Sequence, residues 1–112
     1  MGVIKGKEKV LIDKVARWYR GQGYKAETEY WCRAGRIDIL TYAHVIEVKL
    51  VLTRKKLFES IGQVLIYKQD MNNMLQAIVV GQRSNERVTK IVETATELGV
   101  TVQFWEDMVL LN

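Results

Sequence analysis

The chain has 112 residues, nearly half of them hydrophobic, and this length fits one folded domain over residues 1–112. Its single cysteine, Cys32, excludes an internal disulfide and a cysteine-based zinc or iron–sulfur site. No apolar run reaches the roughly 18 residues that span a bilayer, and the lysine-rich start lacks the apolar stretch of a secretory signal. We therefore expect a cytoplasmic, intracellular protein with no membrane partner and no small-molecule organic cofactor.

Charge is distributed unevenly along the chain. Residues 1–56 hold 13 basic and 6 acidic side chains, a net charge of +7, whereas residues 57–112 hold 4 and 7, a net charge of −3. A basic half favours a polyanionic partner, of which nucleic acid is the most common. The alternative is that these charges only solvate helix faces.

Apolar residues recur at helical spacing over residues 5–20, which predicts a first helix that ends at Gly21. Three short segments of β type follow, over residues 24–31, 35–41 and 44–50. The short connections between them predict antiparallel pairing of successive strands.

A second long helix is expected over residues 54–71, followed by an apolar strand over residues 75–80 and a last strand over residues 100–105. The apolar segment 108–111 fits none of these elements. The order α-β-β-β-α-β-α-β predicts one α/β domain with a mixed central sheet and helices on both faces.

A third helix lies between the last two strands. Ser84 or Asn85 can cap its start, and Gly99 can end it. Its apolar stripe is formed by Val88, Ile91, Val92, Ala95 and Leu98.

Two acids and a lysine stand in strands that otherwise resemble buried core. Alternation along a strand predicts that Asp38 points away from Ile37 and Ile39, and that Glu47 and Lys49 share a face. A buried carboxylate is costly unless something pairs with it. The convergence of these three charges therefore indicates a functional site, with a solvent-facing strand edge as the alternative.

The spacing of the strands suggests how the acids meet. A two-residue turn at residues 42–43 would place Asp38 opposite Glu47 and Arg36 opposite Lys49. Like charges about 5 Å apart across a hairpin are destabilising, and a divalent cation would remove that penalty. Tyr-Ala is a poor sequence for such a turn, and a longer loop would shift the pairing.

Carboxylate ligands favour Mg²⁺ over zinc, and we expect Mn²⁺ to substitute. Lys49 can orient or help to deprotonate an attacking water, or neutralise charge on a phosphate. Glu8, near the centre of the apolar stripe of the first helix, is a further candidate metal ligand and catalytic residue. Its alternative role is that of a first-turn glutamate favoured by the helix dipole.

The second helix carries a polar stripe. Gln63 and Tyr67 are four residues apart and lie with Ser60 away from Leu57, Ile61 and Leu65. They can bind a water, a phosphate or Lys49, or they form a half-exposed helix face. We take Gln63 as a candidate catalytic residue. The candidate DNA-binding residues are Lys5, Lys7, Arg36, Arg54, Lys55, Lys56 and Tyr67.

The remaining residues with functional chemistry have simpler interpretations. His44 adjoins the predicted hairpin and is interpreted as a turn residue. Cys32 is interpreted as a small strand hydrophobe. Trp18, Trp31 and Trp105 are interpreted as core residues and not as surfaces for stacking bases.

The motif Asp38…Glu47-Val48-Lys49, in this element order, resembles the PD-(D/E)xK nuclease superfamily, which has a restriction-endonuclease-like fold. The resemblance covers about residues 5–105. It implies that Asp38, Glu47 and the main-chain carbonyl of Val48 bind Mg²⁺ and that Lys49 assists the water. Ile37 departs from the family pattern, which often has proline before the first acid.

Two further matches refine the resemblance. Glu8 corresponds to an additional glutamate in the first helix of some members, including archaeal Holliday-junction resolvases. Gln63 and Tyr67 match a Q-x-x-x-Y motif of RecB-like members, although the chain lacks the cysteine cluster of their iron–sulfur relatives. These motifs therefore indicate the superfamily specifically, but they say little about the substrate.

We therefore expect a Mg²⁺-dependent DNA endonuclease that hydrolyses phosphodiester bonds and acts as a homodimer, with structure-specific cutting of Holliday junctions as the favoured form of this activity. One alternative is a sequence-specific enzyme of restriction or homing type. Another is a non-catalytic DNA-binding or assembly subunit on the same fold. Nothing in the sequence favours or opposes an RNA-directed nuclease.

Overall fold

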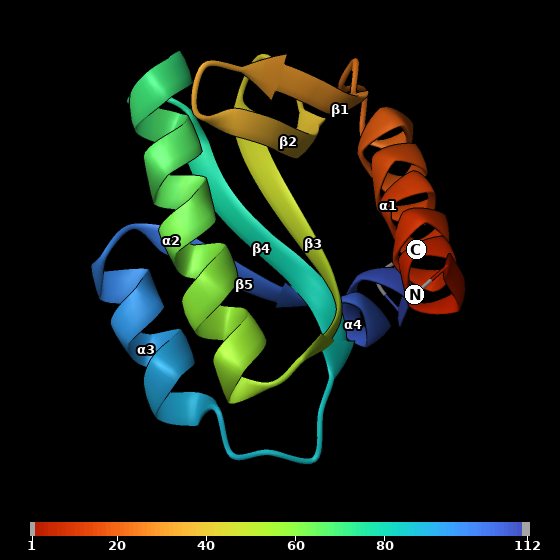
Figure 1. Ribbon diagram of the computed structural model, residues 1–112, viewed down its shortest axis with the longest axis vertical. Helices are drawn as coiled ribbons and strands as arrows, with labels where there is room; N and C mark the ends of the chain where they lie inside the picture. The colour runs from red at the N-terminus through yellow and green to blue at the C-terminus, as the bar shows by residue number, and fades with distance from the viewer. Residues whose placement is uncertain (1, 111–112) are drawn as a thin grey trace.

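A mixed sheet of five strands organises the described part of the chain, residues 2–110, in this computed structural model, with side chains described from Gly6 onward. The strands are β1 (Glu27–Cys32), β2 (Gly35–Leu40), β3 (His44–Leu52), β4 (Gln76–Arg83) and β5 (Val100–Phe104). They lie side by side in sequence order (Figure 1). The first three pair antiparallel, and β3, β4 and β5 pair parallel.

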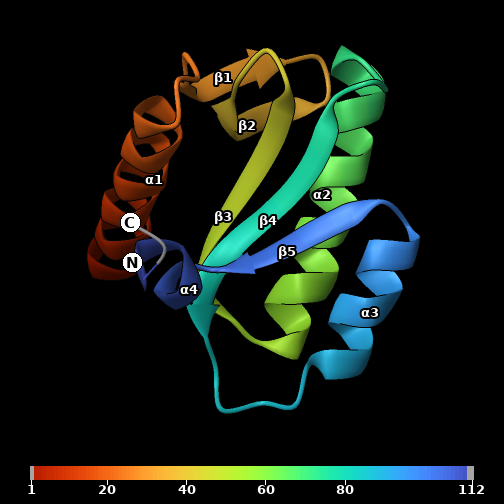
Figure 2. The same ribbon diagram turned by 180° about the vertical axis from the view of Figure 1, so that it is seen from behind.

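Helices cover both faces of this sheet. Within residues 2–110 they are α1 (Gly2–Gly21), α2 (Arg54–Met71), α3 (Thr89–Glu97) and α4 (Trp105–Leu110). α1 and α4 pack on one face, and α2 and α3 pack on the other (Figures 1 and 2). The prediction of one α/β domain with a mixed sheet between helices is confirmed. No helix within this range is both long and apolar enough to cross a bilayer.

Two cores follow from the alternation of side chains along the central strands. Ile46 and Val48 of β3 enter the core against α1, whereas Val45 and Leu52 enter the core against α2. We call these the α1-side core and the α2-side core. Because both faces are buried, the central strands are almost continuously apolar, as their sequences indicate.

The β2–β3 turn has the predicted two-residue length, with Tyr42 and Ala43 at its tip. The main-chain nitrogen of Thr41 donates to the His44 carbonyl at 3.0 Å. The Thr41 hydroxyl accepts from the nitrogens of Ala43 at 3.0 Å and His44 at 2.9 Å. These side-chain bonds stabilise a turn whose Tyr-Ala sequence is otherwise unfavourable.

The start of the third helix differs from the prediction. α3 begins at Thr89, with Val88 at the N-cap position and no side-chain cap. The Ser84 hydroxyl accepts from the nitrogen of Glu86 inside the preceding loop, so it caps a turn and not the helix. Gly99, with φ of 85°, follows the end of α3 as predicted.

The C-terminal segment forms a short helix that the sequence pattern did not predict. β5 ends at Phe104, and Trp105, predicted to be the last strand residue, opens α4 instead. Met108 is buried in the α1-side core, which explains the apolar character of this segment. Leu111, also in the predicted apolar tail, lies outside the described residues.

The three tryptophans do not share one environment. Trp18 and Trp105 pack against the α1-side core and are partly buried. Trp31 lies on the edge strand β1 with 73% of its surface exposed, so its interpretation as a core residue was wrong. An edge strand has a neighbour on one side only, and the α1-side core does not extend over Trp31.

Candidate functional site

Asp38 and Glu47 meet where the pairing of β2 with β3 loses its regular form. Regular pairs join Leu40 to Val45 and Ile39 to Ile46. Beyond them, the main-chain nitrogen of Asp38 donates to Glu47 Oε1 at 3.2 Å. The predicted placement of Asp38 beside Glu47 in this hairpin is confirmed.

A second hydrogen bond completes this contact from the other strand. The main-chain nitrogen of Val48 donates to Asp38 Oδ2 at 2.9 Å. Each acid therefore accepts a hydrogen bond from a main-chain nitrogen of the opposite strand, in place of the usual bonds between backbones.

The backbone is distorted at the same level of the sheet. Ile37 packs in the α2-side core and Ile39 in the α1-side core, so the prediction that they share a face was wrong. Glu29, between the β1 residues that pair with Ile37 and Ile39, has φ of 54°. Such a conformation is uncommon outside glycine and often marks functional sites. The irregularity allows Asp38 to turn toward Glu47.

Both carboxyl groups are buried and interact electrostatically. Asp38 is 6% exposed and Glu47 is 3% exposed. Burial raises the pKa of Glu47, and the negative charge of Asp38 and a hydrogen bond between the two side chains raise it further. Lys49 opposes the shift only weakly. The raised pKa favours the protonated form of Glu47, which lessens the repulsion between the two carboxyl groups.

Lys49 lies two residues after Glu47 on β3, at a point where the strand pairing is irregular. Its side chain is 11% exposed, with Nζ 4.0 Å from Glu59 Oε1 of α2. The pairing of β3 with β4 shifts between Lys49 and Val51. A Cβ atom on Gly81, which pairs with Lys49, would lie 2.4 Å from the Lys49 carbonyl oxygen. Glycine at position 81 therefore allows this backbone approach.

A cleft of about 540 Å³ opens beside these residues. Its lining comes from α1, the first three strands and the start of α2: Glu8, Lys9, Ile12, Glu29, Arg36, Lys49 and Lys56. In Figure 1 the β1–β2 hairpin lies between the upper ends of α1 and α2. Four of the lining residues are basic and two are acidic, so the cleft favours an anionic ligand.

Glu8 lines the cleft and does not join the acid pair in a three-residue group. Burial raises its pKa, with Lys49 opposing the shift and Asp38 reinforcing it. Among residues 6–110, no three His, Cys, Asp or Glu side chains gather closely enough to hold a metal ion. Glu8 is thus not part of a three-residue ligand group with Asp38 and Glu47 in this structure.

The donor set of the pair nevertheless suits a hard cation. Asp38 and Glu47 offer carboxylate oxygens in direct contact, which is the ligand type that Mg²⁺ prefers. A cation between them would offset their mutual repulsion. The chemistry of the two residues therefore fits Mg²⁺, with one or two protein carboxylates and water as ligands.

The polar stripe of α2 is more buried than expected. The buried residues of this helix are Leu57, Ser60, Val64 and Tyr67, whereas Ile61 and Leu65, predicted as its apolar side, are only partly buried. The Ser60 hydroxyl donates to the Lys56 carbonyl at 2.8 Å within the helix. Ser60 therefore packs in the core and does not contact the cleft.

Gln63 and Tyr67 differ in their partners. Gln63 Oε1 is the buried side-chain atom, among the described residues, that has no hydrogen-bond partner. Burial raises the pKa of Tyr67, as do Glu47 and Asp38, so its hydroxyl lies near the acid pair. A Cβ atom on Gly35 would lie 3.0 Å from this hydroxyl, and Gly35 has φ of 145°. Glycine at position 35 leaves room for Tyr67.

The candidate DNA-binding residues lie in more than one place, and some of them lie at the cleft or near the acid pair. Arg36 and Lys56 line the cleft, where Arg36 lies 3.4 Å from Glu29 and Lys56 lies 3.7 Å from Glu59. Tyr67 is close to the acid pair, as described above. These are the candidates that the structure brings to the site.

The other candidates lie elsewhere. Arg54 donates to the Arg87 carbonyl at 3.1 Å, in the loop before α3. Lys55 is exposed at the start of α2, and Lys7 lines a different groove along α1. The side chain of Lys5 lies outside the described residues.

Sequence reasoning missed three charged residues of the site. Lys9 and Glu29 line the cleft and form an ion pair at 3.6 Å, and Glu59 contacts both Lys49 and Lys56. A signal for Glu59 was present, because it precedes Gln63 and Tyr67 at four-residue spacing on one helix face. Nothing in the sequence placed Glu29, since its position depends on the distorted strand.

His44 and Cys32 have structural roles, as predicted. His44 is buried, its Nδ1 lies 2.8 Å from the Thr41 hydroxyl, and burial lowers its pKa. Cys32 packs against the α2-side core. The Cys32 thiol and the neighbouring Arg33 interact with Asp70 of α2, which ties the β1–β2 hairpin to that helix.

Comparisons of the chain with models of known protein families, with curated proteins and with solved structures find no match. A function can therefore be inferred only from the sequence motifs and from the geometry described above.

Proposed function

We propose that this chain is a Mg²⁺-dependent DNA endonuclease that hydrolyses phosphodiester bonds on a restriction-endonuclease-like topology. One observation carries the proposal: Asp38 and Glu47 are buried in direct contact, with Lys49 next on the same strand and a basic cleft beside them. An ordinary structural strand would not retain two touching carboxyl groups, because their burial and repulsion are costly.

Asp38 and Glu47 would hold the metal ion, with the main-chain carbonyl of Val48 as a further ligand. When bound, the ion polarises the phosphate and lowers the pKa of its coordinated water. Glu8 and Gln63 would support this site through water, and the unpartnered Oε1 of Gln63 is available as an acceptor.

Lys49 would act on the water and the phosphate. Its ammonium group is largely buried, so its charge is weakly screened and acts strongly on charge that develops nearby. It would orient the attacking water and offset negative charge on the phosphate oxygens. Glu59, 4.0 Å away, holds Lys49 before a substrate phosphate takes its place.

The remaining cations of the cleft would bind the DNA backbone. Arg36, Lys56 and Lys9 line the cleft and would contact phosphates. Arg54 and Lys55 open α2 outside the cleft lining, and Tyr67 lies near the acid pair. A domain of 13.0 kDa has little surface with which to engage a duplex alone. We therefore propose a homodimer with two active sites and favour branched DNA over a specific duplex sequence.

A non-catalytic DNA-binding subunit is the second candidate. It is favoured by the separation of Glu8 from the acid pair, because residues 6–110 offer no third carboxylate close enough to share one cation. Such a protein would bind DNA through the same cleft without cutting it. Metal binding that depends on Asp38 distinguishes the two candidates.

The decisive experiment is a cleavage assay on labelled linear duplex, single strand, circular plasmid and four-way junction with Mg²⁺, Mn²⁺ or EDTA. The variants are Asp38→Asn, Glu47→Gln and Lys49→Met, and the control is Glu93→Gln on the exposed side of α3. We expect metal-dependent cutting that falls at least about 100-fold in the three variants and is unchanged in the control. Cutting that survives in Asp38→Asn, or binding without cutting, would overturn the proposal.

A further inference from the structure

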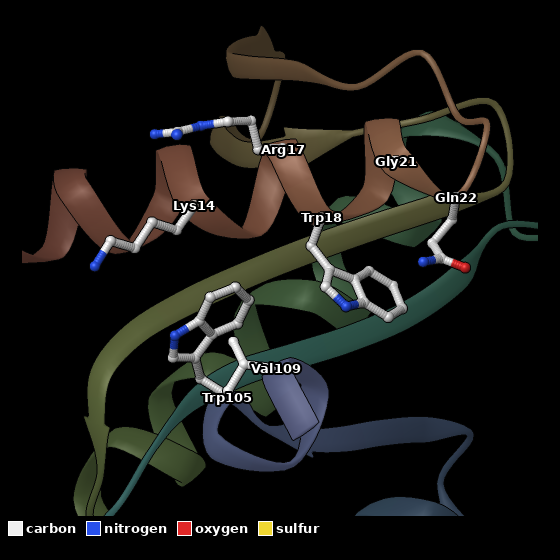
Figure 3. A pocket seen from close by; sticks show the side chains of 7 residues that line it. All are labelled: Lys14, Arg17, Trp18, Gly21, Gln22, Trp105 and Val109. Atoms are coloured by element: carbon white, nitrogen blue, oxygen red, sulfur yellow. The ribbon is translucent and has the colours of Figure 1, made fainter. Parts of the chain in front are cut away.

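A second groove, separate from the cleft, runs between α1 and α4. It consists of two adjoining hollows of about 440 and 650 Å³ that share Lys14 and Trp105 in their linings. Figure 3 shows Lys14 and Arg17 on α1, with the rings of Trp18 and Trp105 between α1 and α4. The groove thus has a cationic rim and an aromatic floor.

The groove and the cleft lie on different sides of α1. At about 100° per residue, Glu8, Lys9 and Ile12 of the cleft face one way. Lys7 and Lys14, seven residues apart, lie together on the other side and line the groove. A ligand bound in the cleft therefore leaves these cations available to another segment.

The charge of the groove is uniformly positive. Its lining holds Lys7, Lys14 and Arg17, and none of its described lining residues is acidic. The acids nearest in sequence to Trp105 are Glu106, which accepts from the nitrogen of Arg83 at 2.9 Å, and Asp107, paired with the Arg83 guanidinium at 2.6 Å. The cleft, by contrast, contains Glu8 and Glu29.

The floor is preformed and partly apolar. Trp18 Nε1 donates to the Met108 carbonyl at 3.3 Å, which fixes one ring between the two helices. Val10 and Val109 flank the floor with about half of their surfaces exposed. Cations around aromatic and aliphatic surface are the combination that binds the phosphates and the sugar and base faces of a nucleic acid strand.

Charge also decides between the possible occupants. A second copy of the chain, docked here around a two-fold axis, would bring Lys14 and Arg17 of both copies close together. Like charges facing each other across an interface oppose association. A polyanion has the opposite effect, because each contact releases condensed counterions.

We propose that this groove binds a second segment of the nucleic acid whose first segment lies in the cleft. This inference rests on the proposed function and extends it, because the substrate must then reach around α1. Lys14 and Arg17 contact its phosphates, and Trp105 supports its sugars or bases. A substrate of one helical turn fills the cleft only, whereas a longer duplex or a four-way junction engages both surfaces.

The test compares two double charge reversals in DNA binding with EDTA present, so that cutting does not interfere. Lys14→Glu/Arg17→Glu alters the groove, and Lys68→Glu/Lys90→Glu makes the same change of charge on α2 and α3, across the sheet. Lys14, Arg17 and Lys90 are exposed and Lys68 is partly exposed, so both variants should fold, which urea unfolding checks. The probes are a one-turn duplex, a three-turn duplex and a four-way junction at several salt concentrations.

We expect the groove variant to lower the salt slope of log K by about 1.8 for the longer probes, because each phosphate contact contributes about 0.9. The one-turn duplex and the control should change much less. Equal effects of the two variants on all probes would overturn the inference. So would a groove variant that binds normally but changes from dimer to monomer by light scattering, since the groove would then hold a second copy.

The outcomes keep this inference separate from the proposed function. If cutting requires Asp38 but the groove variant has an unchanged salt slope, the proposed nuclease function is supported and the groove inference is overturned. If the groove variant has a reduced salt slope but the wild-type chain does not cut DNA, the groove inference is supported and the nuclease function is overturned. Failure of the wild-type chain to bind any probe would overturn both.

Discussion

Asp38 and Glu47 each accept a hydrogen bond from the main chain of the other's strand. Asp38 Oδ2 lies 2.9 Å from the nitrogen of Val48, and Glu47 Oε1 lies 3.2 Å from the nitrogen of Asp38. The two acids thus replace the backbone pairing of β2 with β3 at this level. A substitution that removes the acceptor oxygen of either acid therefore alters the strand geometry as well as the charge of the site.

The coupled pair makes stability depend on pH. Burial raises the pKa of Glu47 above its ordinary value of 4.5, so the native state keeps a proton that the unfolded chain releases. The free energy of unfolding therefore falls as pH rises above about 4.5. In EDTA, we expect urea unfolding to require less denaturant at mildly alkaline than at mildly acidic pH.

Glu47→Gln tests the source of this dependence, because glutamine keeps the shape and cannot ionise. The variant should show a flatter profile of stability against pH than the wild type. Glu8→Gln is the comparison, since burial raises the pKa of Glu8 in the same direction but Glu8 is only half-buried. If the wild-type chain becomes more stable as pH rises, the inference that Glu47 is protonated in the native state would be wrong.

Gly81→Ala should disturb the site without touching a charged residue. The added Cβ atom would lie 2.4 Å from the Lys49 carbonyl oxygen and 2.7 Å from Leu52 Cγ. We expect a loss of about 1–3 kcal/mol in the free energy of unfolding, as in other overpacked cores. Urea unfolding measures it, and cleavage assayed well below the melting temperature should fall further than stability explains.

Gly62→Ala provides the matched control. Nothing lies within 4 Å of a Cβ atom at this helical position in α2. Alanine should therefore stabilise the helix by about 0.5–1 kcal/mol and leave cleavage unchanged. A Gly81→Ala protein that unfolds and cuts like the wild type would contradict the close approach of β3 and β4 at Lys49.

The sequence predicted most of this fold because its patterns are local. α2 has the predicted bounds, 54–71, because its helical spacing is a local pattern. The structure adds an N-cap at Thr53, whose side chain accepts from the nitrogen of Lys56. The register that joins Asp38 to Glu47 followed from counting residues across a short turn. That turn forms because the Thr41 side chain bonds to it, which turn propensities for Tyr-Ala do not include.

The errors arise where contacts between distant residues decide the outcome. Ile37 changes face because the strand is distorted opposite Glu29, and no periodicity encodes that distortion. Trp31 is exposed because β1 is an edge strand, a property of the whole sheet. α4 forms where Met108 can enter the α1-side core, a contact with residues far away in the sequence.

Gln63→Leu should separate stability from activity. Its buried Oε1 has no hydrogen-bond partner among the described residues, and an unpartnered buried oxygen costs about 1–3 kcal/mol. We expect the variant to be more stable in EDTA and to cut DNA more slowly, because the site loses an acceptor. Gln69→Leu, on the exposed side of α2, is the control. A less stable Gln63→Leu protein with normal cleavage would assign Gln63 a packing role alone.

Glu59→Gln should increase the affinity of the cleft for DNA. Glu59 Oε1 lies 4.0 Å from Lys49 Nζ and 3.7 Å from Lys56 Nζ, so its charge competes with a phosphate for both cations. Because Glu59 and Lys56 are well exposed to solvent, the gain should be modest, about 2–5-fold in the dissociation constant at low salt and less at high salt. Fluorescence anisotropy with labelled duplex in EDTA measures it, beside Glu93→Gln as the control. Weaker binding would mean that Glu59 positions Lys49 for the substrate and does not compete with it, and cleavage by the variant should then fall as well.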